Sequence, residues 1–436
     1  MPPTPDSLGT ITGRNIRSGE PLNICVIGSG ISGLSTAFYL SKFLNVDITV
    51  FERADAFGGR ANVTGNGEHC PRVFLSNYKR LFSILREVEN EDGLAVYETL
   101  QPVHRYTHVE GRGWAEISHL YVVLAKELSL AERLRVLKAR HASPLVAAQV
   151  PGANDNRYGS VRNFSPLSLA RVITNLHRST IAFALGGPTD ECLTSPWVRY
   201  LEKVGVTFRR SHPVNSITPS PHGVSVHSPA GALTFDAVVV ATFVSDAADL
   251  LAASGIDHRL KALDHVHCQC LTLRLDPRER IFEGGRLGLY SREGINVVLQ
   301  PGHSRCVVLC TRPLSTDVSY VVSRVRHFLS LEYAIPSITV RNNHQPAEAI
   351  YAADYIRPTS ILRRNLPRIY FAGSYIKNSY PIDSGESAAR SAFNAVQRIQ
   401  RDYHLSACPC PSTESRPGEA ADSQHPAQPA LEARRA

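Results

Sequence analysis

A glycine-rich turn between a short apolar strand and a helix constrains the fold of this chain more than any other feature. Residues 22–27, LNICVI, form an apolar, β-branched run, and residues 31–43 carry apolar side chains at helical spacing. Residues 46–52, VDITVFE, return to a strand pattern. Parallel strands must be joined by a crossover, so the segment predicts a βαβ unit.

Within the turn, Gly28, Gly30 and Gly33 fill the three glycine positions of a dinucleotide-binding fingerprint. The first permits a tight turn, and the second lets a pyrophosphate approach the N–H groups at the start of the helix. The third lets helix and strand pack closely. The predicted cofactor-binding turn also includes the intervening residues Ser29, Ile31 and Ser32.

An acidic residue supports this interpretation. Glu52 ends the second strand, where a carboxylate can accept hydrogen bonds from ribose hydroxyls. Its place at a strand end predicts partial burial, and its charge would repel the 2′-phosphate of NADP. We assign Glu52 and the following Arg53 to a dinucleotide site, in preference to an empty glycine turn.

A second glycine pair distinguishes FAD from NAD. Gly58 and Gly59, followed by Arg60, place flexible backbone and a cation near the same pyrophosphate. The alternative is a surface turn with a solvated arginine. FAD is long, so a distant segment must meet its ring.

The carboxy-terminal part of the chain supplies such a segment. Residues 368–373, RIYFAG, predict a buried strand that ends in glycine. A helix should follow, with Asp383 as N-cap and Glu386 as its capping-box partner. The N–H groups at such a helix start can stabilise negative charge on a reduced flavin.

With both ends in view, the chain resembles the flavin amine oxidase and carotenoid desaturase superfamily. Residues 50–61, VFERADAFGGRA, are similar to the family's start, and residues 369–375 and 383–392 to its carboxy-terminal flavin motif. Residues 69–85 and 181–217 most resemble plant-type phytoene and zeta-carotene desaturases. The resemblance implies an α/β fold, with a discontinuous Rossmann-type FAD-binding domain and an α+β substrate domain.

The resemblance also implies cofactor contacts in the later segments. The backbone of Val214 would contact adenine, and Gly373 and Ser374 would meet the pyrophosphate or ribityl chain. Ser387 and Ala388 would lie near the N1/O2 edge of the flavin. The family usually has an acid at the position of Ser374 and a glycine at that of Ser387.

Two aromatic residues flank the flavin motif. Tyr375 and Tyr380 could line a substrate pocket or pack in the core. The carboxy-terminal motif has neither histidine nor cysteine between His344 and His404, so FAD should be bound noncovalently.

The predicted division of the chain is discontinuous. It comprises a flexible leader (1–20), three FAD-binding parts (21–90, 201–260 and 346–404), a helical substrate lobe (91–200), a substrate-domain sheet (261–345) and a disordered tail (405–436).

Charge and cysteine content limit the partners and the compartment. The net charge of +8 comes mostly from scattered arginines, so no nucleic-acid partner is expected, although peripheral contact with an anionic membrane is compatible with it. The nine cysteines are irregularly spaced, unlike a secreted disulfide framework. No apolar stretch reaches the ~18 residues of a membrane span. We predict a cytoplasmic protein, with any membrane association peripheral.

Residues 265–270, HVHCQC, have the composition of a metal site. In a strand, however, His265 and His267 would face one way and Cys268 and Cys270 the other, so four ligands could not converge. A strand of the substrate sheet is the favoured interpretation, and no metal is predicted.

The leading functional hypothesis is an FAD-dependent dehydrogenase or desaturase. It would transfer hydride from an extended apolar isoprenoid or polyene to flavin N5, with oxygen or a quinone as electron acceptor. No catalytic residue is identified.

An amine oxidase is one alternative, but the lysine that many of them keep near N5 has no counterpart between Lys261 and Lys377. A redox-neutral double-bond isomerase, or a nonenzymatic FAD-bound scaffold, is the other.

Overall fold

We analysed a computed structural model of the chain. It describes residues 20–63, 67–109, 113–116, 129–131, 181–260, 265–266, 268–279, 286–290, 295–300, 304–310, 316–343, 350–351, 361–362, 366–380 and 383–408. The leader up to residue 19, much of the predicted helical lobe (117–128 and 132–180) and the tail beyond 408 lie outside the described residues.

A five-stranded parallel sheet organises the nucleotide-binding part of the molecule. Its order is β19-β11-β1-β2-β7, and each neighbouring pair is parallel. The strands are β1 (Leu22–Ile27), β2 (Val46–Phe51), β7 (Thr207–Arg209), β11 (Ala237–Val240) and β19 (Ile369–Phe371). The predicted α/β class and βαβ start are therefore confirmed, and three separate stretches of chain build this sheet.

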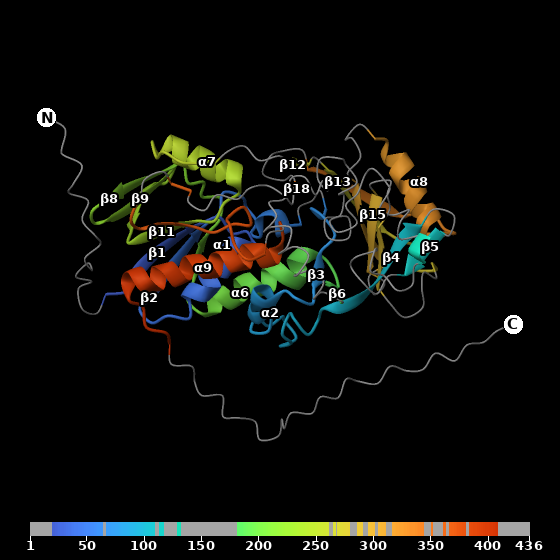
Figure 1. Cartoon of the computed structure of the whole chain (residues 1–436), viewed down its shortest axis with the longest axis horizontal. Helices are drawn as coiled ribbons and strands as arrows, with labels where there is room; N and C mark the ends of the chain where they lie inside the picture. Colours follow the sequence, from blue (N-terminus) through green and yellow to red (C-terminus); the bar gives the residue numbers. More distant parts are fainter. Residues whose placement is uncertain are drawn as a thin grey trace, which may run out of the picture.

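Helices cover one face of the parallel sheet (Figure 1). Ile24 and Val26 of β1 belong to the same buried cluster as these helices. The helices are α1 (Ile31–Leu40), α2 (Lys79–Leu85), α6 (Ser195–Lys203) and α9 (Gly385–Tyr403). The apolar face of α9 lies against α1, so the last helix of the chain packs on the first.

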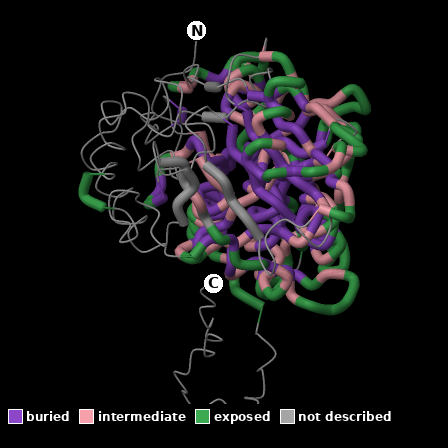
Figure 2. Tube along the Cα trace, turned by 90° about the vertical axis from the view of Figure 1, so that its right-hand side faces the viewer, coloured by how far each residue is buried: buried purple, intermediate pink, exposed green. Residues whose placement is uncertain are grey.

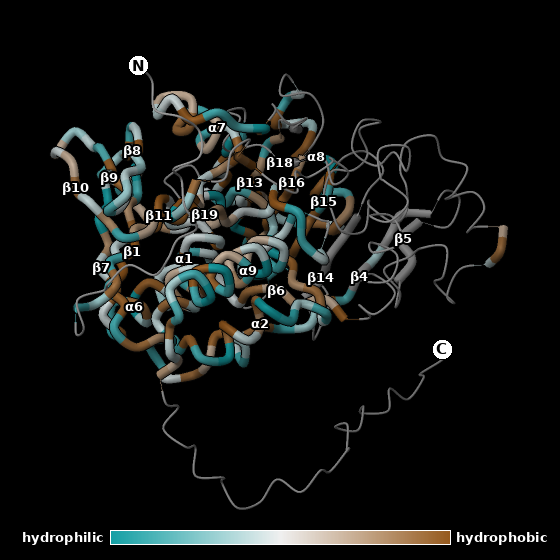
Figure 3. The backbone as a smooth tube through the Cα atoms, turned by 60° about the vertical axis from the view of Figure 1, so that its left-hand side comes forward, coloured by the Kyte–Doolittle hydropathy of each residue, from teal (hydrophilic) through white to brown (hydrophobic). Residues whose placement is uncertain are grey.

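The opposite face of the sheet is also covered, which explains why β11 is wholly apolar and β1 is apolar at every residue except Asn23. Cys25 and Ile27, the alternate residues of β1, pack in a second cluster with α7 and an antiparallel meander. These elements are α7 (Val244–Ala253), β8 (Ser216–Ser220), β9 (Gly223–Ser228) and β10 (Gly231–Phe235). Figure 3 shows the apolar strands between the layers, and Figure 2 shows buried residues in the interior.

A larger sheet forms the second part of the molecule, with α8 (Val318–Leu329) packed on one face. Its order is β17-β13-β16-β15-β14-β4-β6-β3, with β5 paired to β4. The strands are β3 (Val73–Leu75), β4 (Gln101–Val109), β5 (Gly113–Glu116), β6 (Ala182–Ala184), β13 (Cys268–Arg274), β14 (Arg286–Tyr290), β15 (Ile295–Gln300), β16 (Arg305–Cys310) and β17 (Ser337–Asn343). A separate pair joins β12 (His265–Val266) and β18 (Ile350–Tyr351).

The expected helical lobe over 91–200 is wrong at its start. Residues 101–109 and 113–116 form the antiparallel strands β4 and β5, and β4 continues the substrate sheet through parallel pairing with β14. The β-branched and aromatic residues Val103, Tyr106 and Val109, followed by the turn sequence EGRG, favour a hairpin over a helix. Among the described helices, none is both long and apolar enough to cross a membrane.

Candidate functional site

The first glycine turn leads from β1 directly into α1. Gly28 adopts a φ of 101°, which a side chain would strain, and an added Cβ would lie 3.0 Å from the carbonyl oxygen of Ala241. A Cβ on Gly33 would lie 1.9 Å from the carbonyl oxygen of Gly28. At Gly30 a Cβ would meet only the carbonyl oxygen of Gly58, at 3.9 Å, so this glycine leaves space above the helix start. The space around the three glycines is therefore compatible with the three roles predicted for them.

The second glycine pair lies directly against the first turn. The N–H of Gly58 donates to both the carbonyl oxygen (3.1 Å) and Oγ (3.2 Å) of Ser29. Gly58 and Gly59 both have positive φ, 110° and 55°. A Cβ on Gly59 would lie 3.1 Å from Cα of Gly30. Two glycine-rich segments thus present their backbones at one place, the start of α1.

Glu52 shapes this turn as well as lining it. Its Oε2 accepts hydrogen bonds from Ser29 N–H at 3.0 Å and Ser29 Oγ at 2.6 Å, and its Oε1 accepts from Ala54 N–H at 2.9 Å. The expected partial burial is wrong, because the residue is only 8% exposed. The β1 turn and the β7 segment cover the end of β2, so this carboxylate is enclosed instead of open to solvent.

An ion pair links the second glycine pair to the carboxy-terminal segment. Arg60 Nη1 lies 2.7 Å from Asp383 Oδ2, and Nη2 lies 2.9 Å from Oδ1. Ser374 Oγ donates to the same carboxylate at 2.5 Å. The Arg60 guanidinium also lies 5.0 Å from the ring centroid of Phe243. Asp383 therefore brings Arg60 and Ser374 together.

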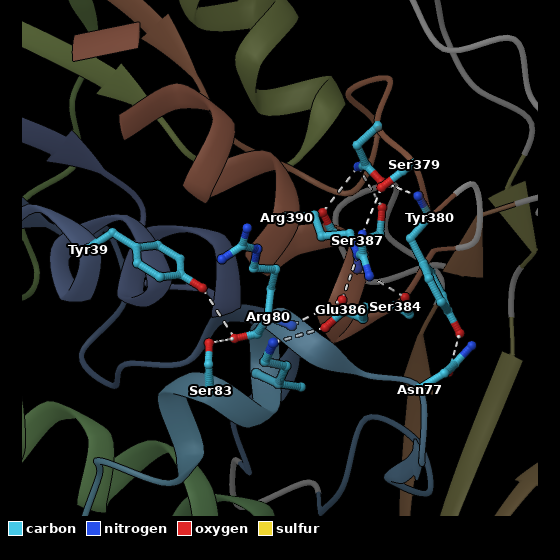
Figure 4. A network of polar contacts seen from close by, with 12 residues as sticks. Tyr39, Asn77, Arg80, Ser83, Ser379, Tyr380, Ser384, Glu386, Ser387 and Arg390 are labelled. Atoms are coloured by element: carbon cyan, nitrogen blue, oxygen red, sulfur yellow. Dashed lines mark hydrogen bonds and ion pairs between the residues drawn. The ribbon is translucent and has the colours of Figure 1, made fainter. Parts of the chain in front are cut away.

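The start of α9 differs from the predicted capping box. Ser384 is the N-cap, and its Oγ accepts from the N–H of Ser387 at 3.2 Å. Glu386 reaches across to α2, where it accepts from the N–H groups of Arg80 (3.1 Å) and Leu81 (2.9 Å). Figure 4 shows this network, which fastens the start of α9 to the start of α2. Asp383 is unavailable for capping because Arg60 and Ser374 hold its carboxylate.

A cavity of about 780 Å³ joins these segments. Most of the predicted cofactor-binding residues line it, together with Tyr375: Gly28, Ser29, Gly30, Ile31, Ser32, Glu52, Arg53, Gly58, Gly59, Arg60, Val214, Gly373, Ser374 and Ala388. The described lining does not include Gly33, Ser387 or Tyr380.

These three residues lie behind the wall of the cavity. Ser387 is fully buried, and its Oγ accepts from Asn378 Nδ2 at 3.0 Å. Tyr380 packs edge-on against Tyr78, with ring centroids 5.5 Å apart, and it is Tyr78 that faces the cavity. The Tyr380 hydroxyl reaches Asn77 (Figure 4). Tyr375 and Tyr380 are the two candidates that the sequence offers for a substrate pocket. Tyr375 lines the cavity, and Tyr380 packs in the core.

One end of the cavity is acidic. Glu52, Asp246 and Asp249 line it near Val214, and Arg53 pairs with Asp246 at 3.0 Å. Burial raises the pKa of the Asp246 carboxyl, and the charge of Arg53 acts in the opposite direction. Carboxylates at this end can accept hydrogen bonds from ribose hydroxyls and would disfavour a 2′-phosphate.

The other end is basic and was not identified from the sequence. It contains Arg72, which directly precedes β3, and Arg341, on β17. The Nη1 of Arg341 donates to the carbonyl oxygens of Asn62 (3.0 Å) and Gly67 (3.3 Å). His69 and Cys70 line the same end. A lone arginine before a strand is usually solvated, so the sequence offered no signal for this role.

A buried ion pair supports the basic end from behind. Arg305 Nη2 lies 3.0 Å from Glu68 Oε1, which also accepts from Thr189 N–H at 2.9 Å. The Nη1 of Arg305 donates to Gln300 at 3.3 Å. The substrate-sheet face behind residues 67–72 is therefore polar.

The aromatic side chains at the cavity remain neutral. Burial raises the pKa of the Tyr78 hydroxyl and of the Tyr375 hydroxyl well above that of an ordinary tyrosine. Both rings consequently present uncharged surface at neutral pH. Burial likewise raises the pKa of the Cys70 thiol, so it is mostly protonated.

The residues present fit an FAD molecule. A volume of about 780 Å³ falls in the usual range for cofactor pockets, about 300–1,000 Å³. The open space at Gly30 suits a pyrophosphate, and the acidic end suits a ribose. The start of α9 meets the cavity through Ser384, Gly385 and Ala388, where a flavin ring would end.

The described residues contain no group of three or more potential ligands that could hold a metal ion. Cys268 and Cys270 belong to the HVHCQC segment, which has the composition of a metal site. They are buried in β13, opposite Asn343 and Arg341 of β17. They lie in the substrate sheet, as the sequence favoured.

Comparisons with known proteins agree with this fold. Residues 26–88 match the family model of an NAD(P)-binding Rossmann-like domain. No curated protein matches the chain at the level of sequence. A proposed protoporphyrinogen oxidase from Exiguobacterium sp. 255-15 has a similar structure, with a TM-score of 0.56 and 14% identity over 87% of this chain and 99% of that one.

Two further solved structures are similar to the same extent. An oxidoreductase from Methanosarcina mazei has a TM-score of 0.55 and 15% identity, and covers 86% of this chain and 100% of its own. Cyclohexylamine oxidase from Brevibacterium oxydans IH-35A has a TM-score of 0.55 and 14% identity, with coverage of 88% and 100%. At this level of identity the likeness establishes the fold, and the chemistry must be argued from the site.

Proposed function

We propose that this chain is an FAD-dependent oxidoreductase that removes hydrogen from an extended, largely apolar substrate of the isoprenoid or polyene type. The observation that carries the proposal is the single cavity that joins both glycine turns to the start of α9. The oxidoreductases with a similar fold support the enzyme class. Oxygen or a quinone is the proposed electron acceptor, and the cytoplasm, with at most peripheral membrane contact, the proposed compartment.

The cofactor would lie in the cavity from its acidic end to the start of α9. Its adenosine would meet Val214 and the acidic end, and its pyrophosphate would meet the N–H groups at the start of α1. Gly373, Ser374 and Ala388 would then lie beside the ribityl chain and the ring. FAD is favoured over NAD because the Arg60–Asp383 pair draws the carboxy-terminal segment into the same cavity.

When bound, FAD supplies a ring that can accept hydride from a substrate carbon. The protein would position the substrate and exclude water from this place. Phe74, Leu193 and Tyr375 are nearly fully buried residues of the lining and provide apolar surface for both tasks. None of the described lining groups is required as an acid or base for hydride transfer.

Amine oxidation is the second candidate. It is favoured by the similarity to cyclohexylamine oxidase. It is disfavoured by the absence of lysine between Lys261 and Lys377, which covers most of the substrate sheet. A redox-neutral double-bond isomerase would use the same cavity without net reduction of the flavin.

An anaerobic reduction experiment separates these functions. The purified protein is mixed with cyclohexylamine or with a linear isoprenoid polyene, and flavin absorbance is followed. We expect bleaching by the polyene and none by the amine. Rapid bleaching by the amine alone would contradict the proposal and restore the amine oxidase, and an isomerised product formed without net bleaching would show an isomerase. Re-admission of oxygen or a quinone then identifies the acceptor.

A further inference from the structure

Charge is distributed unevenly along the cavity. The acidic end carries Glu52, Asp246 and Asp249 against the single cation Arg53. In the middle, Arg60 is matched by Asp383. At the basic end, the described lining contains Arg72 and Arg341 but no carboxylate. The phosphates of a dinucleotide would lie near the start of α1 and Arg60, where backbone N–H groups already supply donors, so the arginines of the basic end are not needed to hold them.

Arg72 is the least satisfied of these cations. Its Nη2 donates to the carbonyl oxygen of Arg60. Its Nε is buried and has no hydrogen-bond partner in the described part of the chain, where no carboxylate pairs with the guanidinium either. A buried N–H on a charged group is costly to leave without an acceptor. The site therefore lacks an acceptor, and an anionic one would suit it best.

The neighbouring acidic residue pairs with another cation. Glu68 lies four positions before Arg72, and its Oε1 is held by Arg305 and by the N–H of Thr189. Its Oε2 is buried and has no hydrogen-bond partner among the described residues, so it does not satisfy Arg72 either. The charge of Glu68 is matched by Arg305, and the charge of Arg72 is left for a ligand.

The surroundings of Arg72 define the rest of that ligand. Val73 and Phe74 follow Arg72 in the chain and line the cavity with it, and Phe74 packs against Tyr78, another lining residue. Leu193 also lines the cavity. Phe74, Tyr78 and Leu193 are buried, with at most 7% of each residue exposed. An arginine with an apolar wall beside it matches a molecule with a carboxylate at one end and a hydrocarbon body.

We propose that the basic end of the cavity binds the carboxylate of an amphipathic substrate, with Arg72 as the residue that determines this specificity. This inference rests on the proposed function, since it describes the substrate of the same site. The carboxylate would accept from Arg72 Nε, and the hydrocarbon would lie along the apolar wall toward the flavin.

The test compares three ligands of equal chain length, palmitate, methyl palmitate and hexadecanol, by calorimetric titration of the flavin-loaded protein. We expect palmitate to bind about 10- to 100-fold more tightly than the other two, the usual effect of a hydrogen bond to a charged group. Arg72→Gln should remove this preference while leaving the affinity for hexadecanol unchanged. Arg199→Gln, a matched change on α6 outside the cavity lining, should leave the preference intact.

Several outcomes would overturn the proposal. They are equal binding of palmitate and its ester, no binding of palmitate at millimolar concentration, and an undiminished preference for the acid in Arg72→Gln. A variant that loses flavin but keeps the acid preference would show that Arg72 serves the cofactor instead. If Arg72→Gln fails to fold, Arg72→Lys and the ligand comparison in the unaltered protein still decide the question.

The flavin content of every sample is measured from its absorbance spectrum. A protein that carries no flavin but prefers palmitate would contradict the proposed function and support the carboxylate site. A flavoprotein that bleaches with polyenes but binds acid and ester equally would do the reverse.

Discussion

Arg60 and Asp383 lie 323 positions apart in the sequence and form a two-point ion pair in which both N–O distances are below 3 Å. Asp383 is largely buried, with 8% of its side chain exposed, whereas Arg60 is 27% exposed. The pair joins the second glycine turn to the residues before α9. It therefore holds together two segments of the cofactor site that are far apart in the sequence.

Breaking this pair should destabilise the protein. We expect Asp383→Asn to lower the free energy of unfolding by about 1–3 kcal/mol, because the partly buried guanidinium loses a charged, two-point acceptor. Urea denaturation measures the change. Glu91→Gln, which breaks the exposed Arg199–Glu91 pair, serves as the control and should have little effect. Equal effects of the two changes would show that the buried pair is no stronger than a surface contact.

Substitution by alanine should have different effects at two glycines of the first turn. Gly33→Ala places a Cβ 1.9 Å from the Gly28 carbonyl oxygen, so we expect a loss of about 1–3 kcal/mol or more in stability. Gly30→Ala has an allowed φ of −65° and no contact closer than 3.9 Å, so the fold should persist while FAD affinity falls. Thermal melting and flavin retention after gel filtration separate the effects. Full flavin retention in Gly30→Ala would argue against a pyrophosphate there.

Glu52 should matter for both cofactor and fold. Glu52→Gln weakens the acceptor of Ser29 N–H and Oγ, and we expect about 1–3 kcal/mol lower stability together with reduced flavin occupancy. Glu52→Arg should be more severe, because a cation replaces a buried carboxylate. Glu202→Gln on the exposed side of α6 is the control. Wild-type flavin content in both Glu52 variants would remove this residue from the site.

FAD should dissociate intact from the denatured protein. The carboxy-terminal motif has no histidine or cysteine to which a flavin could be attached. Precipitation with acid should therefore leave the yellow colour in the supernatant. Colour retained in the pellet would indicate a covalent link elsewhere, and Cys70, as a thiol in the cavity lining, would be the first position to examine by mass spectrometry.

Cys70 also reports on occupancy of the cavity. Removal of FAD should increase its alkylation by iodoacetamide, since this thiol lines the cavity, while exposed Cys408 should react at the same rate with or without FAD. Burial raises the pKa of the Cys70 thiol above its ordinary value. Because only the thiolate reacts, the rate should rise roughly tenfold per pH unit from pH 7 to 9 without a plateau. Peptide mass spectrometry measures both rates, and a plateau near pH 8 would contradict the raised pKa.

Local features of the site could be predicted from the sequence. The strand, glycine turn and helix over residues 22–40 follow from side-chain pattern and from the backbone freedom of glycine, which act over short distances. Strand β19 and helix α9 follow in the same way. These elements bring most of the predicted cofactor-binding residues to one cavity.

Partners across the chain could not be predicted. The sequence DSGES allows either Asp383 or Ser384 to cap α9, and Arg60, far away in the sequence, selects Ser384 by occupying Asp383. Glu386 likewise accepts hydrogen bonds from N–H groups at the start of α2 and does not cap its own helix. Arg72 carries no local signal, since its role depends on which elements surround it. The β4 strand depends on its pairing with β14, about 180 residues later.

The order of strands in the parallel sheet has a consequence for synthesis on the ribosome. Strand β11 lies between β1 and β19, and roughly 340 residues separate the end of β1 from the start of β19. At about 5–20 residues per second, translation of that interval takes roughly 17–70 s. Throughout that time the apolar face of α1 lacks α9, its final cover. During this time the nascent chain carries an incomplete domain with exposed apolar surface, which is prone to aggregate. The yield of the protein in cells should therefore depend on chaperones that bind exposed apolar segments.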